Sequence, residues 1–327
     1  MAVHLYMLVF DSMKKFIIKV FIFFTLVVFV DYLFGVVCSF MIKESKGGVT
    51  RQMHNLCFED QYDILIMGSS RAHHHYVPEI IADSLGATVY NAGQDGNGII
   101  LHYGVLQMVC KRYNPKMIIY DVYKPFDIYK YAEDQNNTRY IKPLKKYHNE
   151  NGIKAIMTDI NKRLELYLNS NLYRLNGSFV SILNDFLLTR PMDKNGYAPL
   201  YGEYNIDNKR REEKRREELE MDSLKLHYIK ELVSFCKARN IQLVFSISPS
   251  FEFSISPSFE LNDSEAYSPI IDICKKYDVV LMNFDNAKPL NEQNFLWKEP
   301  VHLNHNGAIE FTCNYVIPEL KKYYKHN

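Results

Sequence analysis

The chain has 327 residues and a formal net charge of +1 at neutral pH, from 39 lysines and arginines against 38 acidic residues. This balance gives no reason to expect nucleic acid as a partner, because nucleic-acid-binding surfaces are strongly basic. With 47% hydrophobic and 24% charged residues, the chain suits one large globular domain with an appendage. None of its six cysteines forms a C-x-x-C pair, so we expect mostly free buried thiols, with at most one disulfide.

The first predicted element is a single transmembrane anchor at residues 14–42. Phe16 to Ile42 is apolar almost throughout and exceeds the roughly 20 residues that cross a bilayer. Asp31 interrupts it, and a charge at mid-bilayer costs a few kcal/mol, so we place Asp31 nearer the far interface. Lysines flank both ends, and the lysine-rich start favours an uncleaved signal anchor with residues 1–13 in the cytoplasm. A buried core helix is the alternative.

Residues 43–60 are predicted to be a linker, because two adjacent glycines and scattered polar residues occur there. Beyond it, residues 61–327 alternate short apolar runs with helical patterns. The run Ile64 to Met67 is typical of a strand buried on both faces. Similar runs predict further strands at residues 87–90, 117–120, 241–247 and 279–282. Helices are expected at 78–85, 99–113, 221–239, 267–277 and 307–324. This alternation predicts a three-layer α/β/α sandwich.

Two serines follow the first predicted strand directly, after Gly68. Open α/β sheets do their chemistry at the carboxyl ends of the strands, so Ser70 is a candidate nucleophile. A serine needs a base beside it, because its hydroxyl is almost never ionised at neutral pH. The alternative is a turn whose hydroxyls cap the next helix.

A candidate base stands near the other end of the chain. Residues 297–308 read W-K-E-P-V-H-L-N-H-N-G-A, with Glu299 three residues before His302. A carboxylate can hold one imidazole nitrogen and leave the other free to take a serine proton. Alone, this stretch is also compatible with an ordinary loop that leads into a helix.

Residues 126–222 break the alternation and are predicted to be a mostly helical insertion over the active-site edge, where specificity would lie. Within it, the mixed-charge run 209–220 is typical of a solvated helix face. The octapeptide F-S-I-S-P-S-F-E at 245–252 recurs unchanged at 253–260, and we expect one copy to complete a strand and the other to project as a loop.

Three histidines, His73 to His75, follow the two serines. Adjacent side chains at a helix start point in three directions, and no second cluster of ligands is evident along the chain. The sequence therefore predicts no metal site.

These blocks together resemble the SGNH/GDSL hydrolase superfamily, in its membrane-anchored bacterial branch. Its first block, Gly-x-Ser, matches Gly68 to Ser70, and its second, Asn-x-Gly, matches Asn91 to Gly93. Its last block, Asp-x-x-His followed by Leu-Asn-x-x-Gly, matches Glu299 to Gly307, with glutamate in place of aspartate. The resemblance covers roughly residues 61 to 325. It implies a flavodoxin-like parallel sheet of five strands in the order 2-1-3-4-5, and a triad of Ser70, His302 and Glu299.

One block departs from this pattern. The family's third block supplies an oxyanion-hole asparagine after the third strand, where this chain has Asp121-Val122-Tyr123. The backbone N–H groups of Ser70 and Gly93 remain as donors. Losing one donor typically costs about 10²–10³ in rate. Asn97 is a candidate replacement, with capping of the following helix as its alternative role.

Asn91 and Arg71 are candidate substrate-binding residues, although a structural ion pair is the favoured role of Arg71. The resemblance implies a serine hydrolase or O-acyltransferase without a cofactor, acting on acyl esters of cell-envelope polysaccharide. It would sit in the bacterial inner membrane, with the catalytic domain on the outer side. The rival interpretation is a catalytically inactive protein of the same fold that serves as a binding or assembly partner in polysaccharide export.

Overall fold

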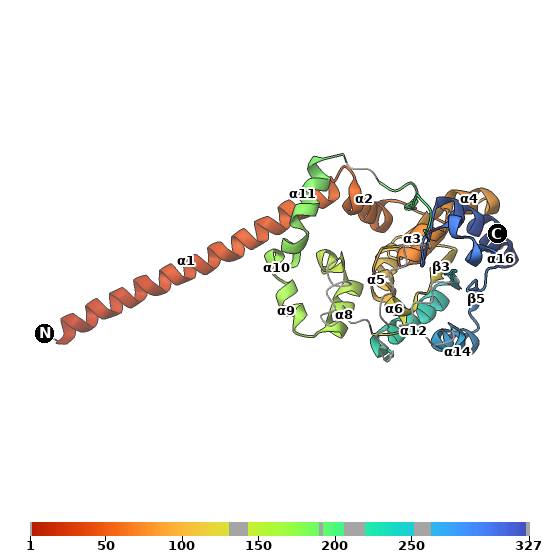
Figure 1. Ribbon diagram of the computed structural model, residues 1–327. Helices are drawn as coiled ribbons and strands as arrows, with labels where there is room; N and C mark the ends of the chain where they lie inside the picture. The colour runs from red at the N-terminus through yellow and green to blue at the C-terminus, as the bar shows by residue number, and fades with distance from the viewer. Residues whose placement is uncertain (1, 131–142, 190–191, 206–219, 252–262, 325–327) are drawn as a thin grey trace.

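A computed structural model describes residues 2–130, 143–189, 192–205, 220–251 and 263–324. Its centre is a parallel sheet in the order β2-β1-β3-β4-β5, which confirms the predicted topology (Figure 1). The strands are β1 (Ile64–Gly68), β2 (Val89–Asn91), β3 (Met117–Asp121), β4 (Gln242–Ile247) and β5 (Val280–Asn283).

The two central strands explain why this sheet forms. Every residue of β1 and β3 is buried, so continuous apolar runs suit them better than alternating ones. Ile64 of β1 pairs with Val89 on one side and with Met117 on the other. The register carries on to β4 and β5 without a shift.

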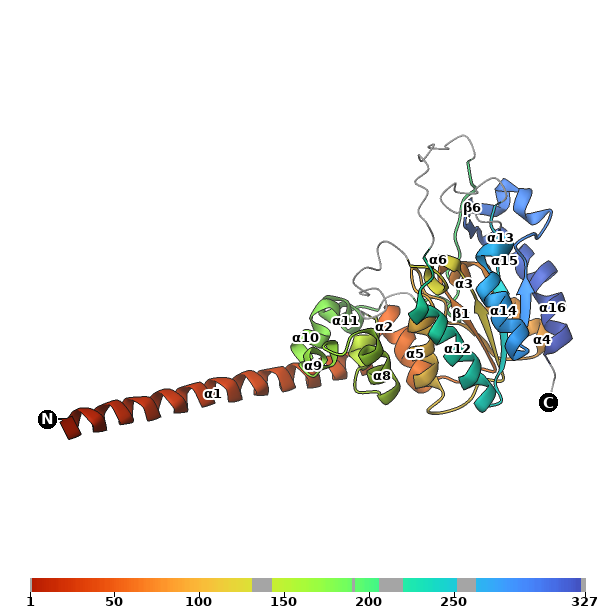
Figure 2. The same ribbon diagram turned by 90° about the horizontal axis from the view of Figure 1, so that it is seen from below.

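Helices cover both faces of the sheet, as a three-layer sandwich requires (Figure 2). One face carries α5 (Ile99–Val109), α12 (Ser223–Ala238) and α14 (Ser268–Tyr277). The other carries α3 (Ser70–His75), α4 (Pro78–Leu85), α15 (His305–Phe311) and α16 (Ile317–Tyr323). Shorter elements are α6 (Lys124–Asp127), α13 (Asp263–Ala266), 3₁₀ turns at 145–147, 290–292 and 294–296, and a π-helical turn at 312–316.

The N-terminal helix α1 (Ala2–Lys43) projects away from the sandwich (Figure 1). From Phe10 to Lys43 it is long and apolar enough to cross a membrane, a property that a signal sequence shares. The expected linker at 43–60 is helical instead, with α2 (Gly48–His54) and a π-helical turn at 55–59. The spacing of Met53, Leu56 and Cys57 places three apolar side chains on one face, and all three are buried in the main core.

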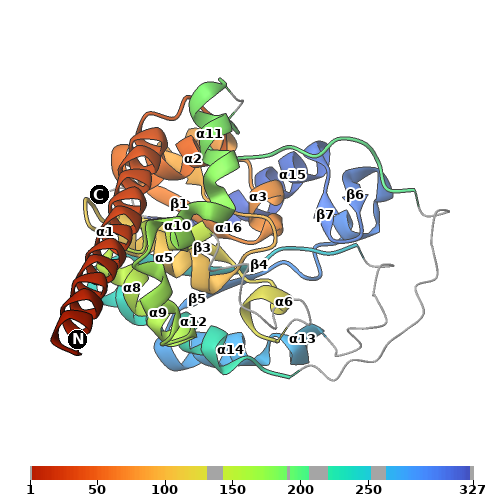
Figure 3. The same ribbon diagram turned by 90° about the vertical axis from the view of Figure 1, so that its left-hand side faces the viewer.

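The predicted insertion folds into α8 (Asn151–Ile160), α9 (Leu164–Leu168), α10 (Asn171–Leu175) and α11 (Phe179–Leu187), with a 3₁₀ turn at 176–178. The helices α10 and α11 lie beside the end of α1, and α8 packs against α5 (Figure 3). These helices are not over the active-site edge, so that part of the prediction is wrong. The reason is a small separate core, in which Cys38 and Met41 of α1 contact Leu175 and Ile182.

Asp31 of α1 also binds this insertion. Its carboxylate accepts hydrogen bonds from the Ser170 hydroxyl at 2.6 Å and from the Leu172 N–H at 2.9 Å. The Asn171 N–H donates to the same carboxylate at 2.9 Å. Asp31 therefore satisfies the orphan N–H groups at the start of α10.

Two sequence features lie partly outside the described residues. The first octapeptide copy supplies the end of β4, as expected, whereas 253–260 is not among the described residues. Most of the charge run 209–220 is likewise outside them. All six cysteines are free, five of them buried and Cys313 exposed.

Candidate active site

Ser70 stands where β1 passes into α3. Gly68 ends the strand with φ +138°, a backbone region that disfavours any side chain. A Cβ at Gly68 would lie 2.5 Å from the Asp121 carbonyl oxygen of β3, so the position also lacks space. Ser69 caps α3, with its hydroxyl accepting from the Arg71 N–H at 3.4 Å. The cap and the glycine present Ser70 at the carboxyl edge of the sheet, next to the switch point between β1 and β3.

Glu299 and His302 lie on an antiparallel hairpin, β6 (Trp297–Glu299) and β7 (His302–Leu303). His302 Nε2 is 2.7 Å from Ser70 Oγ, and His302 Nδ1 is hydrogen-bonded to a Glu299 carboxylate oxygen. That hydrogen bond lowers the pKa of Glu299 below its usual value. Because an ionised carboxylate only accepts, Nδ1 carries the proton and Nε2 presents its lone pair to the serine. The structure thus brings together the three side chains of the predicted triad.

The residues after His302 explain the Leu-Asn-x-x-Gly pattern in physical terms. The Asn304 side chain caps α15 by accepting from the Gly307 N–H at 3.0 Å, and its amide donates to the Phe295 carbonyl at 2.7 Å. A Cβ at Gly307 would lie 2.0 Å from the Leu296 carbonyl oxygen. Asn304 and Gly307 therefore bind the hairpin and the following helix into one unit.

His75 holds the same hairpin from the nucleophile side. Its Nε2 accepts the Leu303 N–H at 3.1 Å, and its side chain is fully buried. Burial keeps the pKa of His75 well below the usual value, which leaves the ring neutral and able to accept. The sequence did not predict that His75 binds the hairpin, because three adjacent histidines do not indicate which of their side chains is buried.

Arg71 is buried, with 1% of its surface exposed. Its Nε donates to Ser248 Oγ at 2.9 Å, and its terminal nitrogens reach the Pro249 carbonyl and the Ser250 hydroxyl. Ser248 in turn donates to the Asp121 carboxylate at 3.0 Å. Burial raises the pKa of Asp121, and the charge of Arg71 opposes that rise. Arg71 thus has a structural role, the one favoured from the sequence, and its contact with substrate stays a prediction.

The expected oxyanion donors are arranged as follows. Ser70 is the first residue of α3, where a backbone N–H has no intrahelical acceptor. The Gly93 N–H donates to Asn91 Oδ1 at 3.0 Å, and the Asn97 amide donates to the Asp95 carbonyl at 2.9 Å. Oxyanion roles for Gly93 and Asn97 therefore stay predictions. The Gly93 N–H would have to leave Asn91 Oδ1, whereas the Asn97 amide has a second N–H besides the one that binds the Asp95 carbonyl.

Asn91 is a structural residue in this conformation. Its side-chain amide donates to the Ala72 carbonyl at 2.7 Å and to the Tyr76 carbonyl at 3.0 Å. With 1% of its surface exposed, Asn91 ties the end of β2 to the middle of α3 and to the residue that follows this helix. Its predicted role in substrate binding stays a prediction.

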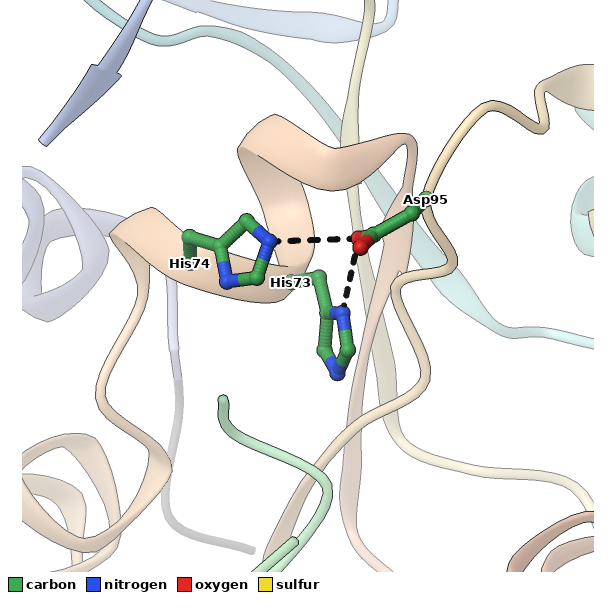
Figure 4. Close-up of side chains that lie close together, drawn as sticks. All are labelled: His73, His74 and Asp95. Carbon is green, nitrogen blue, oxygen red and sulfur yellow. Dashed lines mark hydrogen bonds and ion pairs between the residues drawn. The ribbon is translucent and has the colours of Figure 1, made fainter. Parts of the chain in front are cut away.

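Two of the three histidines converge, which contradicts the expectation that they point in separate directions. His73 Nδ1 is 2.9 Å and His74 Nε2 is 3.2 Å from Asp95 Oδ1, on the loop after β2 (Figure 4). Burial opposes a charge on His73, but hydrogen bonds to Asp193 and Asp95 raise its pKa to about 9. The His74 ring also meets the His302 ring edge-on, with centroids 5.5 Å apart.

The insertion reaches the site through the segment after its helices. The Ala198 carbonyl accepts from His74 Nδ1 at 2.6 Å, and the His305 N–H donates to the Leu200 carbonyl at 2.7 Å. Residues 193–205 therefore form one wall of the site, so this part of the insertion does lie at the expected edge.

The fold and these side chains define an α/β protein with a serine–histidine–carboxylate constellation at the carboxyl edge of its sheet. No family model matches the chain, and no curated protein matches it. Solved structures similar to it include a putative acylhydrolase from Bacteroides fragilis, with 11% identity over 84% of this chain and 97% of that one and a TM-score of 0.38. An acetyl xylan esterase has 11% identity over 80% and 100% of the two chains, with a TM-score of 0.38. A GDSL-like lipase from Bacteroides thetaiotaomicron has 12% identity over 79% and 88%, with a TM-score of 0.33.

Proposed function

We propose that this protein is a membrane-tethered serine hydrolase or O-acyltransferase that acts on acyl esters of cell-envelope polysaccharide. The observation that carries the proposal is the hydrogen-bonded series from Ser70 through His302 to Glu299. A hydroxyl, an imidazole and a carboxylate in this order are the parts that nucleophilic acyl transfer requires.

In the first half-reaction, Ser70 Oγ attacks the ester carbonyl carbon while His302 Nε2 takes the hydroxyl proton. Glu299 stabilises the imidazolium that results and holds the ring in its tautomer. Collapse of the tetrahedral intermediate breaks the bond to the ester oxygen. His302 gives its proton to that oxygen, so an alcohol leaves and the acyl group stays on Ser70.

In the second half-reaction, His302 deprotonates the incoming hydroxyl, which attacks the acyl-serine carbonyl. Water as the acceptor gives a free acid, whereas a sugar hydroxyl gives a new ester. In both cases the proton returns to Ser70 as its ester bond breaks. The wall formed by residues 193–205 is suited to decide between the two acceptors, because it borders the triad hairpin.

The developing oxyanion has the Ser70 N–H as its first donor. Gly93 becomes the second if substrate displaces the Asn91 side-chain oxygen from its N–H. Asp121 cannot replace the missing asparagine, because it is buried and accepts hydrogen bonds from Ser248 and Tyr76. An oxyanion hole with one donor fewer than usual predicts a modest rate.

The end of α1 supports placement of the domain on a bilayer surface. Apolar side chains remain exposed on the insertion helices, including Leu166 at 74% on α9. On α11, which contacts α1, Val180 is 68% and Leu187 57% exposed. Exposed apolar side chains beside a membrane-spanning helix favour contact with lipid. We infer a single-pass inner-membrane protein with its α/β domain on the outer side.

A fluorophosphonate probe tests the nucleophile, because it reacts only with activated serines. The full chain in detergent is labelled beside Ser70→Ala and His302→Ala, with Ser234→Ala, at an exposed serine of α12, as the matched control. We expect labelling of the wild type and the control and none of the other two variants. A folded wild type that takes no label would favour the inactive binding partner over the enzyme.

The substrate class needs a separate assay. Release of acetate from acetylated polysaccharide is measured against release from p-nitrophenyl acetate, with and without unacetylated oligosaccharide. Transfer predicts acetylated oligosaccharide in place of free acetate. Labelling without release from any saccharide would leave the serine chemistry intact and refute the saccharide as its substrate.

A further inference from the structure

The cluster of His73, His74 and Asp95 offers three ligand atoms from two parts of the chain. Both histidines come from α3, and Asp95 comes from the loop after β2 (Figure 4). One atom from each residue lies within 4.8 Å of the others. The proposed esterase mechanism uses none of these three side chains.

In each ring, the outer nitrogen, which is the one that does not face Asp95, has an acceptor of its own. His74 Nδ1 lies 2.6 Å from the Ala198 carbonyl oxygen, and His73 Nε2 lies 3.4 Å from an Asp193 carboxylate oxygen. A carbonyl oxygen only accepts, so His74 Nδ1 carries a proton, and a proton on His73 Nε2 would give the Asp193 carboxylate a donor. In a neutral ring the remaining nitrogen then has a lone pair.

In neutral rings with these tautomers, both lone pairs would face the same acceptor. His73 Nδ1 is 2.9 Å and His74 Nε2 is 3.2 Å from Asp95 Oδ1, an oxygen that only accepts when ionised. Three acceptors at such distances repel one another unless positive charge lies between them. With Asp95 and Asp193 ionised, two further protons or one divalent cation would balance the cluster.

We propose that His73 Nδ1, His74 Nε2 and Asp95 bind one divalent transition-metal ion, with Zn²⁺ as the best match. Two ligands of a tetrahedral zinc ion lie about 3.3 Å apart. The two ring nitrogens are 2.9 and 3.2 Å from Asp95 Oδ1, and all three ligand atoms lie within 4.8 Å of one another. Two imidazoles and a carboxylate are ligands that suit zinc. Asp193 and the Ala198 carbonyl hold the outer ring nitrogens, as partners of metal-binding histidines do.

The site is accessible and stands beside the triad. Asp95 has 62% of its side chain exposed, and a cavity of about 260 Å³ is lined by His73, Asp95 and Asp193. Three protein ligands leave one tetrahedral position for water or a substrate oxygen. Through Asp95, the bound ion fixes the loop after β2. It also fixes His74, whose ring contacts the general base His302 edge-on.

Metal binding is measured on the full chain in detergent, purified with a tag that lacks histidine and treated with a chelator. Co²⁺ is titrated in and followed by its visible absorption, then displaced by Zn²⁺, and bound zinc is counted by mass spectrometry. We expect one ion per chain and absorption of the tetrahedral type.

The variants separate ligands from their neighbours. Asp95→Asn and His74→Gln are expected to abolish binding, whereas Asp193→Asn weakens it about 10–100-fold. His227→Gln, at an exposed histidine of α12, is the control and keeps wild-type affinity. The proposal would be overturned if the folded wild type showed no saturable Co²⁺ binding, or if Asp95→Asn bound Co²⁺ as the wild type does. Two protons, and not a metal ion, would then balance the charge of the cluster. Neither readout depends on esterase activity.

Discussion

Ser70 Oγ and His302 Nε2 lie 2.7 Å apart, although 232 positions separate them along the chain. The first strand of the sheet delivers the serine, and a hairpin that follows the last strand delivers the histidine. The contact depends on His75, which binds the hairpin backbone from the helix that Ser70 begins. Nucleophile and base are thus held by one rigid assembly, as pre-organised catalysis requires.

Replacing Glu299 by glutamine is expected to lower kcat by up to about 10⁴, because an amide can hold His302 in the wrong tautomer. Glu299→Asp, which restores the residue of the SGNH pattern, should retain more activity than Glu299→Gln. Rates of p-nitrophenyl acetate hydrolysis measure both variants, and Glu310→Gln on α15 is the control. Equal rates for Glu299→Gln and the wild type would remove Glu299 from the triad.

Gly307→Ala is expected to destabilise the fold by about 1–3 kcal/mol, because its Cβ would lie 2.0 Å from the Leu296 carbonyl oxygen. Alanine normally favours a helix over glycine, so a loss at this position must come from the clash. Thermal unfolding measures it. Gly177→Ala is the matched control, since its Cβ would meet only Lys145 Nζ at 3.7 Å. A stabilised Gly307→Ala variant would contradict this packing.

Much of the fold was predictable because its signal is local. A short apolar run such as Ile64 to Met67, ended by Gly68, is typical of a buried strand, and the structure has a strand there. Five such runs that alternate with helices predict a three-layer α/β/α sandwich. The arrangement of Ser70, His302 and Glu299 was predicted for another reason, because the blocks that hold them resemble the SGNH pattern at both ends of the domain.

The parts that were missed depend on contacts between distant polar groups. Nothing near His73 and His74 announces Asp95, because the carboxylate reaches them only once β2 lies beside β1. A structural role was favoured for Arg71, but its partners, Ser248 and the Pro249 carbonyl on the loop after β4, could not be named from the sequence. At residues 43–60, the adjacent glycines indicated a linker. The segment is helical because Met53 and its apolar neighbours on the same face pack into the main core.

Asp31→Ala is expected to release the insertion helices from α1, at a cost of about 1–2 kcal/mol for the lost cap. Asp31→Asn should keep most of the docking, because asparagine caps helices as well as aspartate does. Limited trypsin digestion at the exposed Lys162–Arg163 pair, between α8 and α9, reports the release. Faster cleavage is expected for Asp31→Ala alone. Identical digestion of all three proteins would show that Asp31 does not hold α10 in solution.

The stability of the domain should fall in mild acid, and His102 on α5 is one cause. Burial lowers the pKa of His102 from 6.5 to about 4, so the folded state keeps it neutral where the unfolded state is protonated. More protons are then bound in the unfolded state between pH 4 and 6.5, so the free energy of unfolding rises with pH there. The contribution of His102 is complete above pH 6.5 and is lost as pH falls through that window, by about 3 kcal/mol in total. Denaturant unfolding at pH 7.5 and 4.5 should therefore show a smaller acid loss in His102→Leu than in the wild type. His227→Leu, at an exposed position, should behave as the wild type, and an equal acid loss in all three proteins would exclude His102 as a source of the pH dependence.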